Sequence, residues 1–428
     1  MIASVHHLHP KPLPIAAFLR VGHTRHRRLE NLQAGGQLHF GRFVFDAAHI
    51  AQQVDLVRSL QASTAEIVLD PNFAELCIPA RFQTSVSALP WAKPDRAWEP
   101  ADFGRERNFS IAKAIAEFAV KHRVHAVLAP TNLIEDANSA WRLVNMRVCE
   151  ALRAELDALG GQDIAIDYQL ITSGALLRDE PSRNAITQDL ADLPIENIWL
   201  RTSGFGARAT GAGTRQFIES VRHLHAMNRP IIGDNVGGFA GLAAAAFGAI
   251  GGLCHGVAQR ETFRASDWRK SPGGRMGSSV WVYVPELDRY FKEDQLDRLF
   301  AAKGAKARFG CNDTSCCPHG TEDMVENADR HFLNQRSRQI EIVSNAPESR
   351  RAEHFLLNLM DPALNSARMG ARLKIYDPPL ANAVVGARRR VFRLRDALGD
   401  LLRSGGSVTR SRLPGHRNQS RSAASVVS

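Results

Sequence analysis

The stretch that decides the fold is Arg229-Pro230-Ile231-Ile232-Gly233-Asp234-Asn235-Val236-Gly237-Gly238, which runs on to Cys254-His255-Gly256. An apolar run ends in a polar Asp-Asn pair, an alanine-rich helical pattern follows, and a second apolar run ends at a histidine. This order of strand, loop, helix and strand is typical of a β/α unit. Because active sites of barrels and open α/β sheets lie at the carboxyl ends of parallel strands, the stretch also predicts where a site lies.

Six further apolar runs extend this pattern along the chain. Eight strands are predicted in all: Ala17–Val21, Arg42–Phe45, Ala65–Leu69, Val124–Ala129, Ile164–Ile171, Asn197–Thr202, Pro230–Gly233 and Ala249–Cys254. Helical periodicity lies between most of them, so we expect an α/β fold of the (β/α)8 barrel type. An open doubly wound sheet is the alternative, but no G-x-G-x-x-G pattern follows the first strand, which argues against a dinucleotide fold.

The rest of the chain is expected to form smaller units. The barrel is assigned to residues 1–279, with a lid-like insertion near 79–107. Residues 280–375 are expected to form an appended Cys/His subdomain, 376–403 a basic helical segment and 404–428 a disordered tail. From residue 388 onward there are ten Arg and two Asp, which supply +8 of the net charge of +10. Such a segment suits a polyanion such as nucleic acid, and a solvated tail without a partner is the alternative.

The composition also bears on the compartment. Six cysteines, three of them clustered, are too few for the disulfide framework of a secreted protein. The first residues lack the continuous apolar run of a signal peptide. The longest weakly polar run, residues 238–254, is too short and too weakly hydrophobic for a confident membrane span. We therefore expect a cytoplasmic protein with no membrane partner.

Three residues at predicted strand ends are candidates for catalysis. Asp70 follows the run Glu66-Ile67-Val68-Leu69 and could act as a general base, or it could simply cap the next turn. Asp234 could stabilise a cationic transition state, and His255 could donate a proton near neutral pH. Glycosidic cleavage passes through an oxocarbenium-like state, and Asp70 and Asp234 would supply its carboxylate pair if a barrel brings them together.

Candidate substrate-binding residues flank these positions. Arg201 could hold a phosphate or carbonyl through its planar fork, and Ser203 begins a glycine-containing turn behind it. Asn132 and Asn235 follow other strands, and Trp91, in the lid-like insertion, could stack on a base. The structural alternatives are ion pairs, tight turns and packing on the barrel rim.

A cysteine-rich segment predicts a metal site. Cys311, Cys316, Cys317 and His319 offer three thiolates and an imidazole, the donor types that a structural Zn²⁺ site uses. His331 and His354 are reserve ligands, and three reduced structural thiols are the alternative.

Three of these features together resemble the tRNA-guanine transglycosylases and their DNA-directed relatives. Ile67-Val68-Leu69-Asp70-Pro71-Asn72-Phe73 is similar to the family strand that ends in its general-base Asp. Residues 230–256 resemble the final barrel strands, and the Cys cluster, followed by residues 351–360, resembles the zinc segment and the helix after it. The likeness covers roughly residues 60–365.

The resemblance implies a barrel enzyme with a structural zinc that breaks the glycosidic bond of a nucleobase flipped out of nucleic acid. It also implies a homodimer through the zinc region and, since DNA-directed relatives accompany systems that attack foreign DNA, a role in antiphage defence. The family's nucleophilic Asp should fall near Leu253 or Cys254, where no carboxylate stands. We therefore expect hydrolysis that leaves abasic sites, with a modified base in DNA more expected than tRNA. The alternatives are base exchange on tRNA or DNA, a small-metabolite barrel enzyme and a non-catalytic nucleic-acid binder.

Overall fold

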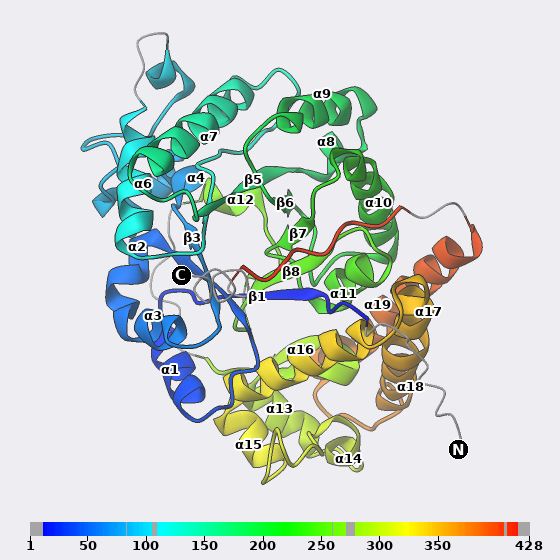
Figure 1. The fold of residues 1–428 in the computed structure, drawn as a ribbon. Helices are drawn as coiled ribbons and strands as arrows, with labels where there is room; N and C mark the ends of the chain where they lie inside the picture. The colour runs from blue at the N-terminus through cyan, green and yellow to red at the C-terminus, as the bar shows by residue number, and fades with distance from the viewer. Residues whose placement is uncertain are drawn as a thin grey trace, which may run out of the picture.

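The computed structural model describes residues 12–82, 84–104, 109–258, 260–270, 279–405 and 409–417. Eight parallel strands pair in chain order, and the last pairs with the first, so the sheet closes into a barrel (Figure 1). The strands are β1 (Ala16–Arg20), β2 (Arg42–Asp46), β3 (Glu66–Asp70), β4 (Ala126–Leu128), β5 (Ala165–Ser173), β6 (Ile198–Ser203), β7 (Ile231–Asp234) and β8 (Gly252–Gly256). The predicted (β/α)8 barrel is confirmed, and each strand overlaps its predicted run.

Helices surround the barrel. In the β/α part they are α1 (His26–Ala34), α2 (Ala47–Ile50), α3 (Val54–Gln61), α4 (Phe73–Leu76), α5 (Pro79–Phe82), α6 (Ser110–Lys121), α7 (Trp141–Ala158), α8 (Gly174–Arg178), α9 (Glu180–Ala191), α10 (Gly211–Arg222), α11 (Gly238–Ala246) and α12 (Ala265–Trp268). None of the helices in the described ranges is long and apolar enough to cross a membrane.

A second unit follows the barrel. It contains the hairpin β9 (Trp281–Val284) and β10 (Arg289–Lys292) and the helices α13 (Glu293–Phe300), α14 (Ala305–Phe309), α15 (Thr321–Glu326), α16 (Ala328–Ser344), α17 (Arg351–Phe355), α18 (Asp361–Gly370) and α19 (Pro378–Arg403). The hairpin and helices α13 to α15 share an apolar core of their own with parts of α18 and α19. Helix α16 carries residues of the main core, so it joins this unit to the barrel.

Side chains alternate along each strand between the barrel interior and the surrounding helices. The middle of the interior is apolar and includes Phe18, Val44, Val68, Trp199 and Cys254. Toward each end of the barrel, the inward-facing positions of the strands are occupied by charged residues. The carboxyl-end row contains the candidate site, and the amino-end row contains Glu66 and Asp167.

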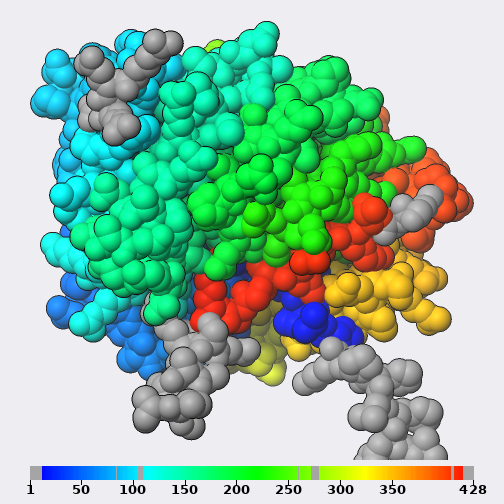
Figure 2. All heavy atoms as spheres, turned by 45° about the horizontal axis from the view of Figure 1, so that its top comes forward, coloured from blue at the N-terminus to red at the C-terminus, as the bar shows by residue number. Residues whose placement is uncertain are grey.

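The amino end of the barrel is covered by residues 409–417, the red segment that crosses the barrel in Figures 1 and 2. Ser411 accepts a hydrogen bond from the Ile231 amide and donates its own amide to Gly248. A Cβ on Gly251 would lie 2.1 Å from the Arg412 carbonyl oxygen, so this close approach requires glycine.

The segment ends at Arg417, whose side chain enters the barrel. Its guanidinium contacts Glu66 at 2.8 Å, Asp167 at 2.5 Å and Glu196 at 3.0 Å. The prediction of a disordered tail from residue 404 is therefore wrong for 409–417, because composition does not reveal buried carboxylates that require a cation. Residues 418–428 lie outside the described residues.

Candidate active site at the carboxyl end of the barrel

Asp70 and Asp234 meet at the carboxyl end of the barrel. One nitrogen of Arg20 donates to Asp70 at 2.7 Å, and the other donates to Asp234 at 3.1 Å. Arg201 joins the same two carboxylates, with its Nη2 3.4 Å from Asp70 and 2.6 Å from Asp234. Carboxylates from β3 and β7 thus share two guanidinium groups from β1 and β6.

Two more charges complete this cluster. Asp46, at the end of β2, accepts from Arg20 at 2.8 Å and from Arg260 at 2.6 Å. Three carboxylates therefore face three guanidinium groups, and the cluster balances its own charge. We call these six residues the Asp–Arg cluster: Arg20, Asp46, Asp70, Arg201, Asp234 and Arg260.

The arginines keep the acids ionised. Burial alone would raise the pKa of Asp234, but Arg201 and Arg20 outweigh it and lower the pKa below its usual value. The pKa of Asp46 is lowered in the same way, with Arg260 and Arg20 outweighing burial. The cluster therefore offers anionic carboxylates suited to stabilising a cation, and Asp234 is unsuited to the role of a protonated general acid.

Two uncharged side chains and one backbone amide orient the cluster. Gln169 donates to Asp234 at 2.9 Å, and Asp70 accepts from the Asn72 amide at 2.9 Å. In the amide orientation that satisfies both neighbours, Asn235 accepts from Arg201 Nε at 3.2 Å and donates to the Arg260 carbonyl at 3.3 Å.

Unusual backbone conformations gather at this end of the barrel. Asn72, Asn235, Ala258 and Arg260 all have φ between 52° and 56°. Asparagine tolerates this left-handed region, but for alanine and arginine it is strained. Such strain persists where the surrounding structure enforces it, commonly at functional sites.

Residues 260–268 cover the Asp–Arg cluster. The Arg201 guanidinium lies 5.8 Å from the Phe263 ring and 6.0 Å from the Trp268 ring. The Phe263 carbonyl accepts from the Gly204 amide, and the Ala265 amide donates to Ser203. Asp234 is fully buried and Asp70 is only 4% exposed, so the two carboxylates are covered in this structure.

Two cavities flank this cover. One, of about 280 Å³, is lined by Asn132, Glu135, Trp141 and Arg269 among others. The other, of about 250 Å³, includes Ser203 and lies between α8 and α10. Neither lining includes Asp70 or Asp234.

The predicted binding residues therefore separate. Arg201 belongs to the Asp–Arg cluster and Asn235 contacts it, whereas Asn132 is held by Asn145 and lines the first cavity. Ser203 contacts the cover and lines the second cavity.

The prediction that His255 shares the mouth with Asp234 is wrong. Cys254, one residue earlier, faces the interior beside Asp234, so strand alternation turns His255 outward. The imidazole lies between the rings of Phe40 and Phe332, and burial lowers its pKa.

Trp91 is equally unsuited to stacking on a base. Its indole is 2% exposed, donates to the Pro71 carbonyl at 3.0 Å and packs edge-on against Phe118 of α6. The insertion around it is anchored to α6, since aromatic surface in a loop is buried where a neighbouring helix offers apolar contact.

The cysteine cluster has the donors for a metal, but with a different histidine. Sγ of Cys311, Cys316 and Cys317 and a ring nitrogen of His331 all lie within 4.8 Å of one another. Three thiolates and one imidazole fit a structural Zn²⁺. Nε2 of His331 is 3.0 Å from the Tyr283 carbonyl, which leaves Nδ1 facing the sulfurs.

His319, the predicted fourth ligand, instead pairs with Asp323, and its side chain is 77% exposed. Sequence spacing misled here because α16 brings His331 back over the cysteines. His354 lies on α17 and bonds Asn358.

Sequence reasoning missed Arg20, Asp46, Gln169 and Arg260. Asp46 directly follows the predicted strand Arg42–Phe45, so the strand-end rule applied to Asp70 would have found it, whereas Arg20 lies inside the predicted strand Ala17–Val21. Gln169 sits inside its strand and Arg260 outside any strand, so neither carried a signal.

Comparisons with known proteins add little to this geometry. No family model and no curated protein matches the sequence. Similar solved structures include endo-1,4-beta-xylanase XylE of Penicillium canescens, at 11% identity over 56% of this chain and 81% of that one, with a TM-score of 0.37. The type I 3-dehydroquinate dehydratase of Clostridium difficile is 8% identical over 61% and 92%, with a TM-score of 0.35. Likeness at this level carries no argument about chemistry, and the barrel rests on its own strand pairing.

Proposed function

We propose that the protein hydrolyses the glycosidic bond of a modified nucleobase in nucleic acid, with DNA as the favoured polymer. The observation that carries the proposal is the convergence of Asp70 and Asp234 on the same two guanidinium groups. An anionic carboxylate beneath the sugar stabilises an oxocarbenium-like transition state, and a second one activates water.

The two acids differ in access, and this assigns their roles. Asp234 is wholly buried and accepts from Arg20, Arg201 and Gln169, so it supplies fixed negative charge. Asp70 is slightly less buried, and its ion pair with Arg201 measures 3.4 Å, whereas each of the other three pairs between these acids and Arg20 or Arg201 has a contact of 3.1 Å or less. Arg201 is therefore the partner that Asp70 holds least closely, and we assign Asp70 the role of accepting a proton from water.

The metal donors support the resemblance to tRNA-guanine transglycosylases. With His331 in place of His319, the set becomes three Cys followed by one His, the donor types of that family's zinc segment, although the cysteine spacing differs. A Zn²⁺ held there would stabilise the appended unit and takes no part in bond cleavage.

Base exchange has less support than hydrolysis. The inward residue of β8 beside Asp234 is Cys254, and burial raises the pKa of its thiol well above the usual value. A neutral thiol is a poor nucleophile, so Cys254 does not replace the nucleophilic aspartate that the resembled family has near this position.

A second candidate is hydrolysis of a small N-glycoside such as a free nucleoside. The observation that favours it is the internal use of the C-terminal arginines: Arg390 pairs with Asp288, Arg395 with Asp361 and Arg417 with Glu66. These cations are not available to a polyanion.

Mass spectrometry of released bases tests both candidates. Purified protein is incubated with modified DNAs, tRNAs and the matching free nucleosides, alongside Asp70→Asn and the exposed control Asp55→Asn. We expect free base from a polymer with wild type and the control, and a loss of at least about 100-fold with Asp70→Asn. Release from nucleosides alone selects the second candidate, and release from no substrate refutes both.

A further inference from the structure

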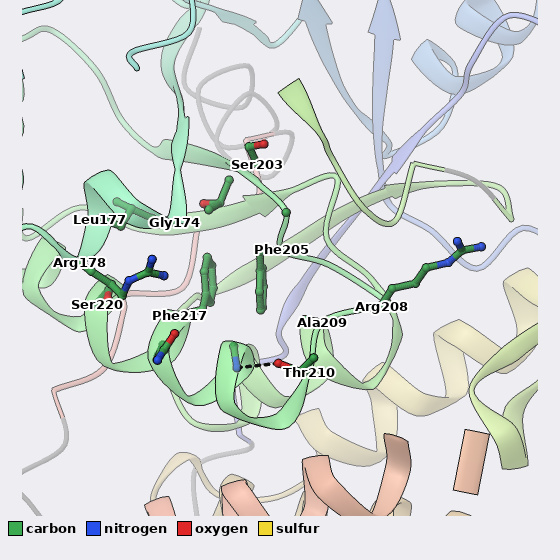
Figure 3. A pocket seen from close by; sticks show the side chains of 14 residues that line it. Gly174, Leu177, Arg178, Ser203, Phe205, Arg208, Ala209, Thr210, Phe217 and Ser220 are labelled. Atoms are coloured by element: carbon green, nitrogen blue, oxygen red, sulfur yellow. Dashed lines mark hydrogen bonds between the residues drawn. The ribbon is translucent and has the colours of Figure 1, made fainter. Parts of the chain in front are cut away.

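A cavity of about 250 Å³ lies outside the barrel, between α8 and α10 and beside the end of β6 (Figure 3). Its apolar wall is formed by Leu177 and by Phe205 and Phe217, whose rings stack at 3.6 Å with an angle of 7° between their planes. Arg201 faces the Asp–Arg cluster and Thr202 faces this cavity, so β6 separates the two.

The charged residues of the lining have one sign. Arg178 and Arg208 contribute to it, and no Asp or Glu does. Arginines elsewhere in the protein pair with buried acids such as Asp46, Glu66 and Asp167. Within the described ranges, Arg178 and Arg208 form no such ion pair. Figure 3 shows Arg178 turned toward Phe217, whereas Arg208 extends away from it. Arg178 is therefore the cation best placed to meet a ligand.

Helix α10 begins at the cavity. Thr210 accepts from the Gly213 amide at 3.1 Å, and both residues line the space. The Gly213 amide is thereby taken by Thr210, and Gly211 and Ala212 lie outside the lining, so the helix contributes the positive potential of its dipole. This end of a twelve-residue helix favours an anion.

An independent observation comes from Thr202, which lines the cavity from β6. Its side chain is 2% exposed, and within the described chain its Oγ1 has no hydrogen-bond partner. A buried hydroxyl without a partner is unfavourable, and a ligand oxygen at this position would satisfy it.

We propose that this cavity binds a phosphate group. The lining combines a guanidinium, a buried hydroxyl and a helix N-terminus and includes no carboxylate, which is the environment that a phosphate favours. The phosphate belongs either to a nucleic-acid end or to a phosphorylated small molecule, and both offer the same chemistry. The site is separate from the Asp–Arg cluster and does not depend on the proposed glycosidic activity.

Isothermal titration calorimetry with inorganic phosphate, at constant ionic strength set by chloride, tests the site. Arg178→Gln is expected to weaken binding about 10-fold and Thr202→Val by roughly 3- to 10-fold, since each removes a donor to a charged group. Arg215→Gln, on the same helix but outside the lining, is the matched control and leaves binding unchanged. If Thr202→Val does not fold, Thr202→Ser with retained affinity tests the hydroxyl instead. No phosphate binding by wild type, or equal binding by all variants, overturns the proposal.

Competition identifies the source of the phosphate. Ribose 5-phosphate and a 5′-phosphorylated oligonucleotide are each tested against inorganic phosphate, with the 5′-hydroxyl oligonucleotide as control. Displacement by one of the phosphorylated compounds supports the site and names its source, whereas displacement by neither overturns it. Base release by Asp70 is a separate measurement, so the two proposals fail independently.

Discussion

Arg417→Met is expected to destabilise the whole barrel although the residue lies only eleven positions from the C-terminus. The guanidinium inserts between Glu66 and Asp167 at the amino end of the barrel, and its side chain is 12% exposed. Glu66 keeps Arg42 as a partner at 3.1 Å after the change. Asp167 keeps only the neutral donors Trp199 and Asn197 among the contacts described.

The size of the effect follows from removing one partner of a buried ion pair, which costs about 3–5 kcal/mol. Unfolding entropy of about 2.1 cal/mol/K per residue gives about 0.9 kcal/mol/K for 428 residues. The expected loss in Tm is therefore about 3–6 °C. Asp167→Asn in the Arg417→Met background should restore much of it, because the amide removes the unpaired charge.

Differential scanning calorimetry measures this loss, with the exposed Arg298→Met as control, for which a change of about 1 °C or less is expected. Burial already raises the pKa of Asp167 against the opposing effect of Arg417. Removing Arg417 raises that pKa further, so the acid takes up a proton as pH falls and the penalty shrinks. The gap in Tm should narrow from pH 8 to pH 5. An unchanged Tm at pH 8 would show that residues 409–417 do not dock on the barrel.

His255→Gln should leave base release nearly unchanged, because the ring faces away from the cluster. A loss of about 100-fold would instead show that His255 takes part in catalysis. His331→Ala should abolish stoichiometric zinc, measured by elemental mass spectrometry, while His319→Ala keeps it; the reverse result would contradict the ligand set. The pKa values of Asp46 and Asp234 are lower in the folded protein than in the unfolded chain, where an Asp titrates at about 3.9. The two ionised carboxylates therefore contribute their full stabilisation of the fold above that pH, and the contribution is lost as pH falls through their lowered pKa values. Melting curves from pH 6 to pH 2 should show this loss, and Asp234→Asn should flatten it.

The sequence could predict the barrel because each strand is a short apolar run bounded by turn residues, and such runs carry local information. It could also predict that Asp70 and Asp234 converge, because closure of a barrel brings all carboxyl ends of its strands together. It could not assign His255 correctly. The predicted strand ends at Cys254, whereas β8 continues to Gly256, and within a strand two neighbouring side chains point to opposite faces.

Long-range contacts were beyond local patterns. His331 reaches the cysteines through a helix fourteen residues beyond Cys317, and Arg417 reaches Asp167 across 250 positions. Both contacts exist because a buried polar or charged group needs a partner. Which groups are buried is known only from the structure, so the sequence does not predict either contact.

The arrangement of charge also explains why the site is closed in this structure. Three carboxylates gathered at the barrel end would repel one another, and three arginines remove that repulsion but occupy the acids as partners. A substrate that only filled space could not compete with Arg201 for Asp70. A substrate that develops positive charge can compete with Arg201, because in its transition state it is a cation that Asp234 and Asp70 attract. The same substrate carries no such charge in the ground state. The cluster is thereby expected to discriminate by charge development rather than by ground-state affinity, which is the behaviour that cleavage of a glycosidic bond requires.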